Sequence, residues 1–197
     1  QTSNSVMTAI VTGDPEKARA LGERYAIRPY GYDEYDALLA SGDIDAVYVA
    51  TPNFRHREFA EPALKAGIHV LLEKPMAGSL SDAEAIEAAA RASGARLMLA
   101  YRLHCEPGAQ AILAAIRAGE IGTPRFFTAT FAQNVDAANH RAQNGFWAGP
   151  IPDMGAYPIN AVRNFFEAEP ISVTAVASKV PERGLGCADT VSVILSF

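Results

Sequence analysis

Residues 69–75, HVLLEKP, decide how the N-terminal half of the chain folds. The run HVLL is short and largely apolar, which is typical of a buried strand of a parallel sheet. Glu73 and Lys74 end the run, and Pro75 biases Lys74 toward an extended backbone and supplies no hydrogen-bond donor. We therefore predict a strand that stops at residue 72 and projects two charged side chains from its carboxyl end.

Similar apolar runs repeat on both sides of this stretch, with amphipathic stretches between them. We predict strands over residues 6–11, 45–52, 69–72 and 96–100, and helices over 15–26, 33–42, 55–66 and 82–93. The stretch RPYGY at 28–32 has the composition of a turn. Strands and helices that alternate at this spacing predict an α/β fold, a Rossmann-type parallel sheet with helices on both faces.

The pattern changes near residue 103. We predict a helix over 106–118, an alternating half-exposed strand over 124–133, a helix from 158, and strands over 171–178 and 190–197. This order is typical of an α+β domain with a mixed or antiparallel sheet. We therefore divide the chain into domains 1–102 and 103–197. Because it starts at Gln1 and stops at Phe197 inside strand patterns, we expect both domains to be truncated.

Composition excludes several classes of protein. The 197 residues are 49% hydrophobic with a formal net charge of −5 and no basic block, so we expect neither nucleic acid nor an anionic membrane surface as a partner. No apolar run reaches the roughly 20 residues of a membrane span. Cys105 and Cys187 read as reduced core residues, and the histidines show no ligand spacing, so we expect no metal site.

Polar residues gather where the predicted strands end, which is where open α/β sheets bind ligands. They are Thr12, Thr51, Pro52, Asn53, Glu73, Lys74, Tyr101 and Arg102. Lys74 is either one half of a solvated ion pair or a cation that holds a substrate hydroxyl. His56 opens a helix, where it either contacts a nucleotide or is simply exposed.

Asp153 and Tyr157 share one face if the backbone around them is helical. Asp153 is alternatively a plain helix cap, and Tyr157 a core aromatic. A tyrosine that exchanges protons at neutral pH needs a cation nearby, because its reference pKa is about 10. Lys74 is the candidate for that cation.

Thr12 and Lys17 flank the start of the helix at 15–26, where a hydroxyl and a cation suit a 2′-phosphate better than a ribose diol. A plain capped helix explains the same residues equally well. The glycine-rich G-x-G-x-x-G fingerprint of dinucleotide sites follows none of the predicted strands, and we expect it upstream of Gln1.

With these residues in hand, the chain resembles the Gfo/Idh/MocA family of nicotinamide-dependent sugar oxidoreductases, most closely its glucose–fructose oxidoreductase-like branch. The stretches that carry the resemblance are VYVATPNFRH, AGIHVLLEKPMA, LMLAYRLH, GEIGTPRFF, DMGAYPINAVRNFFEAEP and DTVSVILSF. The resemblance implies hydride transfer between a sugar or cyclic polyol and NADP, with NAD as the other possibility. It also implies a homo-oligomer, a dimer or tetramer, and a cytoplasmic location by default, although the family has exported members.

The resemblance further implies a role for each matching residue. Lys74, Asp153 and Tyr157 match the catalytic trio, and Arg141 matches a substrate-binding position. The matches for the cofactor site are Thr12, Lys17, Thr51, Pro52, Asn53, His56, Glu73, Lys74 and Arg102. Two alternatives stay open: a trans-dihydrodiol or D-xylose dehydrogenase of the same family, and a regulatory protein that binds dinucleotide without turnover.

Overall fold

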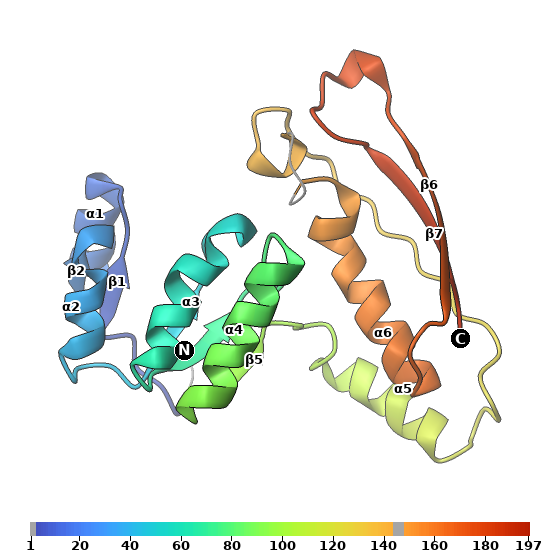
Figure 1. The fold of residues 1–197 in the computed structure, drawn as a ribbon, viewed down its shortest axis with the longest axis horizontal. Helices are drawn as coiled ribbons and strands as arrows, with labels where there is room; N and C mark the ends of the chain where they lie inside the picture. The colour runs from blue at the N-terminus through green and yellow to red at the C-terminus, as the bar shows by residue number, and fades with distance from the viewer. Residues whose placement is uncertain (1–2, 144–147) are drawn as a thin grey trace. The chain divides into compact units, whose positions relative to one another are not determined.

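The computed structural model describes residues 3–143 and 148–197 (Figure 1). These residues form two compact units, each built from several segments of the chain. The first unit contains the chain up to Val49, Arg57–Leu71 and Glu84–Met98; the second contains Ala50–His56, Leu72–Ala83 and Leu99–Phe197. The turns that follow Val49 and Leu71 therefore belong to the same unit as the C-terminal half of the chain.

Strands and helices alternate through the N-terminal half of the chain, as predicted. The strands are β1 (Ala9–Val11), β2 (Arg28–Tyr30), β3 (Ala46–Val49), β4 (His69–Leu72) and β5 (Leu97–Leu99). The helices are α1 (Pro15–Tyr25), α2 (Tyr35–Ala40), α3 (His56–Lys65) and α4 (Leu80–Ser93). β1 pairs in parallel with β2, and a second sheet has the order β3-β4-β5. The α/β class is confirmed, with the strands in two hydrogen-bonded sheets rather than one.

The turn predicted over residues 28–32 is wrong at its start, because Arg28–Tyr30 form β2. β1 supplies the partner, and the backbone N–H of Thr12 donates to the carbonyl of Tyr30 at 3.0 Å. Pro29 lacks a backbone donor, which an edge strand tolerates. The strand depends on pairing with a segment distant in sequence, so the local composition could not indicate it.

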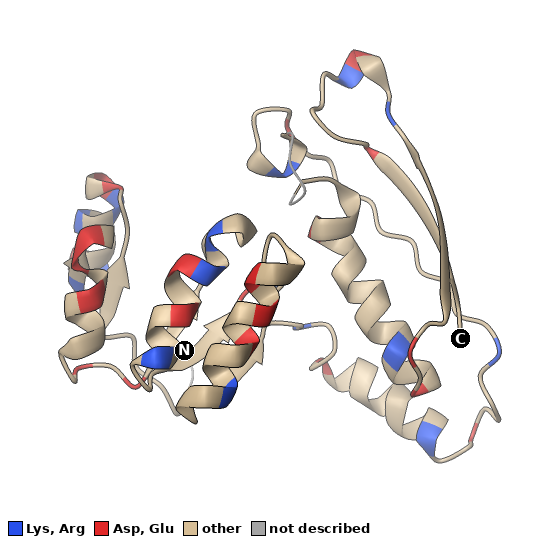
Figure 2. Ribbon diagram, in the orientation of Figure 1, with Lys and Arg blue, Asp and Glu red and all other residues tan. Residues whose placement is uncertain are grey.

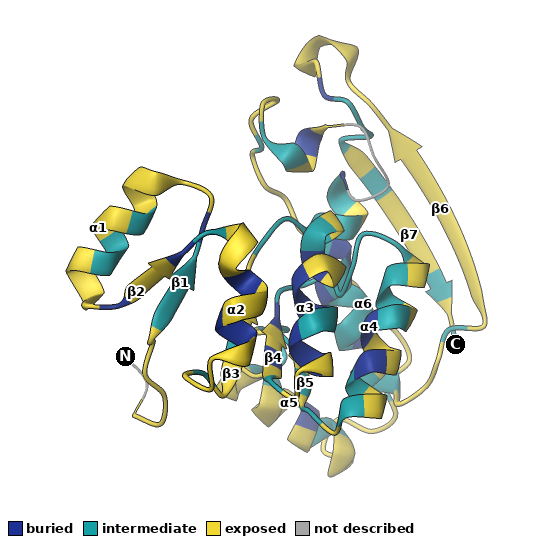
Figure 3. Cartoon of the chain, turned by 60° about the vertical axis from the view of Figure 1, so that its left-hand side comes forward, coloured by how far each residue is buried: buried dark blue, intermediate teal, exposed yellow. Residues whose placement is uncertain are grey.

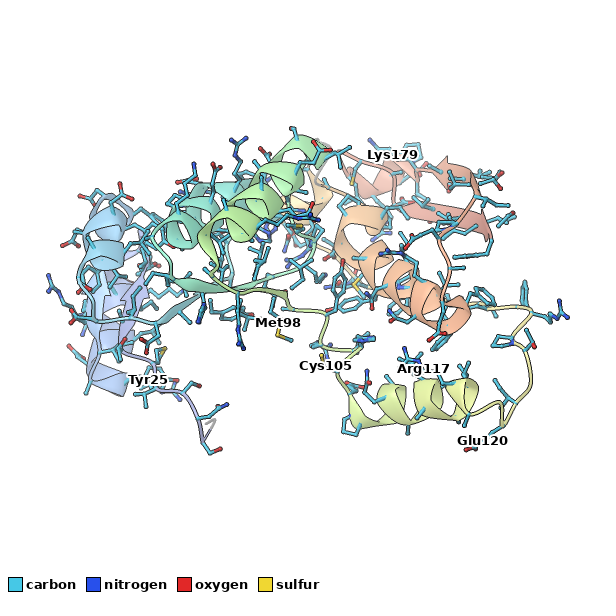
Figure 4. The ribbon with its side chains drawn as sticks, turned by 60° about the horizontal axis from the view of Figure 1, so that its bottom comes forward. Tyr25, Met98, Cys105, Arg117, Glu120 and Lys179 are labelled. Atoms are coloured by element: carbon cyan, nitrogen blue, oxygen red, sulfur yellow. The ribbon has the colours of Figure 1, made fainter. Side chains whose placement is uncertain are left out.

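The sheet β3-β4-β5 buries one of its two faces. Val70 and Leu72 are 2% and 0% exposed, while Leu71 between them is 37% exposed. Helices α3 and α4 lie on one side of the strands (Figure 1). The Met98 side chain points to the other side (Figure 4). Tyr48 and Met98 are 59% and 55% exposed. The helices α3 and α4 thus cover one face of this three-stranded sheet (Figure 1).

The start of α1 and the end of α3 lie where the sequence predicts them. The Asp14 carboxylate accepts hydrogen bonds from the backbone N–H groups of Glu16 and Lys17, which lack partners within the helix. Pro15 occupies the first turn of α1. Gly67 follows α3 with a φ of +80°, a conformation that glycine adopts without strain.

The C-terminal half forms helices α5 (Pro107–Arg117) and α6 (Ala156–Phe166) and strands β6 (Ser172–Ser178) and β7 (Thr190–Ser196). β6 pairs antiparallel with β7 and is exposed along its whole length (Figure 3). The strand predicted over 124–133 is wrong: these residues carry the alternating side chains, but no strand of the described chain pairs with them. Alternation alone does not make a strand, because a strand needs a hydrogen-bonded neighbour.

Acidic and basic residues are interspersed over the helices (Figure 2). Several of them form ion pairs one helical turn apart, such as Arg57 with Glu61 at 2.7 Å and Lys65 with Glu61 on α3. Pairs of this kind on exposed surface contribute at most about 1 kcal/mol each. Among the described helices, none combines the length and the apolar character needed to cross a membrane.

Candidate active site

Lys74 lies in the turn that follows β4, and this turn belongs to the second unit. The backbone N–H of Lys74 donates to Glu73 Oε2 at 3.2 Å, and the Lys74–Pro75 peptide bond is cis. The Lys74 side chain is only 12% exposed, so its ammonium has little access to water. A buried cation needs an anionic or carbonyl partner, because burial removes its hydration.

Asp153 supplies that partner twice. Lys74 Nζ donates to the main-chain carbonyl of Asp153 and lies 3.3 Å from Asp153 Oδ1. The Asp153 side chain is also 12% exposed. The two residues are 79 positions apart in sequence, so this contact depends on the fold. It excludes the solvated ion pair as the explanation of Lys74, which the sequence had left open.

The backbone around Asp153 is a short π-helix, Ile151–Gly155, which leads directly into α6. Short π-helical turns occur frequently at functional sites. In the π register a carbonyl accepts from the residue five positions later, which for Asp153 is Pro158, and proline has no N–H. The Asp153 carbonyl is thus available to Lys74. The backbone from Asp153 to Tyr157 is helical, which was the condition for the two residues to share a face, but it is a π-to-α junction rather than a continuous α-helix.

Tyr157 lies in the first turn of α6 and is buried, with 9% of its surface exposed. Lys74 Nζ is 5.0 Å from the centre of its ring, within the range of a cation–π interaction. The ring of Phe131 stacks on Tyr157 at 6.2 Å, and Tyr101 meets it edge-on at 6.5 Å. The fold therefore brings together Lys74, Asp153 and Tyr157, the three residues proposed from sequence as catalytic.

The sequence reasoning missed Phe131 as a residue that holds Tyr157 in place. Phe131 lies in the stretch predicted as a strand, and its alternating pattern indicated only that one side is buried. Tyr101 was singled out as a strand-end residue, although not for contact with Tyr157. Neither aromatic pair could be deduced without the fold, because the partners belong to segments far apart in sequence.

Arg141 reaches the same carboxylate. It lies in the short helix His140–Ala142, and its Nε donates to Asp153 Oδ1 at 3.1 Å. The Arg141 side chain is 43% exposed, so solvent reaches it more readily than Lys74. Burial lowers the pKa of His140, and the neighbouring Arg141 guanidinium lowers it further while Asp153 opposes the shift. Protonation of His140 is thus disfavoured beside a carboxylate that already accepts from two cations.

The segment after β3 carries Thr51, Pro52 and Asn53. Thr51 Oγ1 is buried, and it has no hydrogen-bond partner among the atoms that the structure describes. A buried hydroxyl without a partner costs free energy unless a ligand or water satisfies it. Pro52 precedes a short helix, Asn53–Arg55, in which Asn53 is half-buried. This segment therefore has the character of a ligand-facing turn.

His56 requires a correction. Its side chain is among the most buried in the chain, at 1% exposed, and both ring nitrogens face backbone carbonyls. A ring in this position has no surface to offer a nucleotide, so the expected contact between His56 and the cofactor is withdrawn. The exposed helical histidine of the alternative interpretation is excluded as well.

Three other predicted residues lie outside the Lys74 cluster. Thr12 and Lys17 belong to the first unit: Thr12 Oγ1 accepts from the backbone N–H of Asp14 at 3.2 Å, and Lys17 is exposed in the first turn of α1. Arg102 is 73% exposed and lies 3.8 Å from Glu106. The roles of these three in cofactor binding stay predictions. Within residues 3–143 and 148–197, no group of three or more His, Cys, Asp or Glu side chains is arranged to hold a metal ion.

Within the second unit, a buried lysine thus contacts a carboxylate and a tyrosine, groups that can bind and exchange protons. Comparison with known proteins identifies the class. Residues 1–101 match the family described as "Oxidoreductase family, NAD-binding Rossmann fold", and residues 109–197 match the "GFO/IDH/MocA C-terminal domain". The chain belongs to the Gfo/Idh/MocA family of oxidoreductases.

Its relatives include an uncharacterized oxidoreductase of Rhizobium meliloti, 35% identical over 91% of this chain and 54% of that protein. A D-xylose 1-dehydrogenase (NADP+) of Haloarcula marismortui is 31% identical over 89% of this chain and 51% of that protein. Among solved structures, the aldose-aldose oxidoreductase of Caulobacter crescentus, complexed with glycerol, is 34% identical with a TM-score of 0.85, covering 96% and 58% of the two chains. This chain spans little more than half the length of these relatives.

Proposed function

We propose that the whole protein is an NAD(P)-dependent sugar oxidoreductase in which Lys74, Asp153 and Tyr157 act on one hydroxyl of an aldose or cyclic polyol. The observation that carries the proposal is the position of Lys74 Nζ, which binds the main chain and carboxylate of Asp153 while facing the ring of Tyr157. The three residues come from distant parts of the sequence and form one polar cluster with little access to water.

The residues at the end of β3 fit a dinucleotide. Thr51 Oγ1 is buried without a partner in the described part of the chain, as expected of a hydroxyl that bonds a ligand. Thr51, Pro52, Asn53 and Glu73 would line the nicotinamide end of the cofactor, beyond the carboxyl ends of β3 and β4. When bound, the nicotinamide accepts the hydride that leaves the sugar carbon.

The chain's own residues handle the proton and the charge. Tyr157 would accept the proton of the sugar hydroxyl on its phenolate oxygen and end as the neutral phenol. The Lys74 ammonium, 5.0 Å from the ring centre, would offset the negative charge of the phenolate and of the developing alkoxide. Asp153 fixes the sugar through its carboxylate, which Lys74 and Arg141 hold in place through Oδ1. With the hydride taken up by the cofactor, the hydroxyl would give its proton to Tyr157 and the sugar carbon would become a carbonyl.

NADP is the cofactor we favour over NAD. Lys17 is exposed at the N-terminus of α1, one turn after the buried Thr12, so a cation and a hydroxyl flank a helix N-terminus. The Asp14 carboxylate already accepts from the N–H groups of Glu16 and Lys17. A 2′-phosphate would therefore be held by the Lys17 ammonium and the Thr12 hydroxyl. The xylose dehydrogenase among the relatives is described as using NADP.

The test measures reduction of NADP and of NAD by the whole protein with a panel of aldoses and cyclic polyols, beginning with D-xylose. We expect turnover with at least one sugar, and a loss on the order of 10²–10⁴-fold in Tyr157→Phe, because only the accepting hydroxyl is removed. Tyr25→Phe is the matched control, since Tyr25 is 46% exposed at the end of α1.

Two results would contradict the proposal. Cofactor binding without turnover on any sugar would favour the regulatory alternative, a dinucleotide-binding protein without catalysis. Turnover by Tyr157→Phe equal to that of Tyr25→Phe would remove Tyr157 from the reaction, even if the protein oxidises a sugar.

A further inference from the structure

We propose that His56 is a positioning residue. It connects the turn after β4, residues 73–79, to the start of α3 and thereby holds Lys74 where it can act on the substrate. The inference rests on the proposed function only in assigning Lys74 to the reaction. The connection itself is a feature of the folded chain and can be measured without substrate or cofactor.

The imidazole of His56 connects two segments that are distant in sequence. Nδ1 lies 2.9 Å from the carbonyl oxygen of Pro75 and 3.3 Å from that of Met76. Nε2 lies 3.0 Å from the carbonyl oxygen of Thr51. Thr51 is close to His56 in sequence, so only the Nδ1 contacts tie separate parts of the chain together. These contacts begin at the residue directly after Lys74.

The protonation of the ring follows from its surroundings. Burial lowers the pKa of His56, while the carbonyl contacts and the charge of Glu73 oppose the shift. A neutral imidazole has one N–H, so it can donate on only one side. We place the proton on Nδ1, where two carbonyls can accept it, rather than on Nε2, where one can. The donated bond then reaches Pro75 and Met76, which follow Lys74 in the chain.

Gly78 provides a second, independent contact between the same two segments. A Cβ atom at this position would lie 2.9 Å from the Cα and 3.2 Å from the Cβ of Phe54. The backbone of the turn therefore packs directly on the backbone that leads into α3, at a distance that excludes any side chain. The turn is thus held at two places: by the hydrogen bond of His56 at Pro75 and Met76, and by close backbone packing at Gly78.

Fixing Pro75 fixes Lys74, because the two share a peptide bond. Asp153 binds the Nζ atom at the end of the Lys74 side chain. Because that side chain has four rotatable bonds, the position of Nζ also depends on the position of the Lys74 backbone. A displacement of about 1 Å in a catalytic group can lower the rate by about 100-fold. His56 supports the root of Lys74 without touching the reacting atoms.

Two substitutions separate the nitrogens of the ring. In His56→Asn the side-chain amide can take the place of Nδ1 and keep the bond to the turn, whereas in His56→Gln the amide reaches the place of Nε2, faces the Thr51 carbonyl and loses the bond to the turn. We expect His56→Gln to lower kcat about 10- to 100-fold with a smaller change in KM, and His56→Asn to stay within about threefold of the unsubstituted protein. His69→Gln is the control, since His69 is exposed on β4 and only accepts from the backbone of Arg96.

Amide hydrogen exchange provides the readout that needs no activity. Peptides covering residues 73–79 are expected to exchange at least about tenfold faster in His56→Gln than in His56→Asn, in protein without ligand. Equal amide exchange over residues 73–79 in the two variants would overturn the proposal that His56 holds the turn. Faster exchange with unchanged kcat would overturn the link to Lys74, whereas an inactive unsubstituted protein would count against the proposed function and leave the exchange result standing.

If His56→Gln does not fold, Gly78→Ala tests the same support without unpairing a buried polar group. The added methyl has to displace the turn from Phe54, so we expect faster exchange over residues 73–79 and a fall in kcat of at least about tenfold. A folded Gly78→Ala protein with unchanged exchange and kcat would overturn the proposal.

Discussion

Asp153→Asn is the substitution whose consequences follow most directly from the site. It preserves the shape of the side chain and removes its charge. Asp153 Oδ1 lies 3.3 Å from Lys74 Nζ and 3.1 Å from Arg141 Nε, so one change weakens two interactions. The bond between Lys74 and the main-chain carbonyl of Asp153 remains, because it does not involve the side chain.

The expected loss of stability can be worked out from these contacts. A hydrogen bond to a charged group contributes about 1.5–3 kcal/mol, and one between neutral groups about 0.5–1.5 kcal/mol. In Asp153→Asn the Lys74 ammonium stays charged, so this contact, with both side chains 12% exposed, keeps a charged donor and loses only the attraction between opposite charges, about 1 kcal/mol. The Arg141 contact loses less, because a guanidinium that is 43% exposed is screened by water. We expect the free energy of unfolding, measured by urea titration, to fall by about 1–2 kcal/mol.

The same change weakens the hold on the sugar. An amide accepts a hydroxyl proton less strongly than a carboxylate does, so kcat/KM for the sugar is expected to fall at least about tenfold, while KM for the nicotinamide cofactor changes little. Asp136→Asn is the matched control: Asp136 is exposed and bonds only the nearby backbone of Ala138 at 2.8 Å. If Asp153→Asn and Asp136→Asn have the same free energy of unfolding and the same kcat/KM for the sugar, the reasoning about the Asp153 carboxylate is refuted.

Two further predictions concern stability. Leu64→Ala is expected to lower the free energy of unfolding by about 2–5 kcal/mol, because the Leu64 side chain on α3 is 0% exposed and its truncation leaves a cavity. Urea titration checks this, and a loss below about 1 kcal/mol would contradict the buried position. The free energy of unfolding is also expected to fall as the pH drops below about 6.5, the usual histidine value, because the pKa of folded His56 is lowered and the unfolded chain binds more protons. The lowered pKa of His140 contributes a fall in the same direction. Urea titrations between neutral and mildly acidic pH are therefore expected to show a smaller fall in the free energy of unfolding for His56→Asn than for the unsubstituted protein. An equal fall in the two proteins would contradict the burial of the His56 ring.

The sequence predicted the elements that depend on local chemistry. The Asp14 cap and Pro15 start α1, Gly67 ends α3, and the run HVLL forms β4, because each depends on neighbours within one turn or on the period of apolar residues. It failed at β2, which exists only through pairing with β1, and over residues 124–133, where alternation is present without a partner strand. Pairing between distant segments is not written into the local pattern.

The candidate site shows the same division. Lys74 and Asp153 could be singled out by their positions at a strand end and near a helix start, but not the bond between them. The chemical need of a tyrosine for a cation correctly suggested that Lys74 and Tyr157 are neighbours, and they are 5.0 Å apart from nitrogen to ring centre. His56 was misplaced, because a histidine at a helix start carries no local sign of burial. Its partners, Pro75 and Met76, come from a turn that only the fold brings close.

The central claim is that the cluster of Lys74, Asp153 and Tyr157 transfers a hydride from a sugar carbon to a nicotinamide. The most direct measurement incubates the whole protein with NADP and an aldose that carries deuterium on the carbon of the reacting hydroxyl, and follows the label by mass spectrometry. We predict that deuterium appears in the reduced cofactor with the unsubstituted protein. In Lys74→Met, which keeps the approximate length of the side chain without its charge, the rate of deuterium transfer is expected to fall at least about 100-fold. Reduced cofactor without deuterium, or equal transfer by Lys74→Met, would contradict the claim.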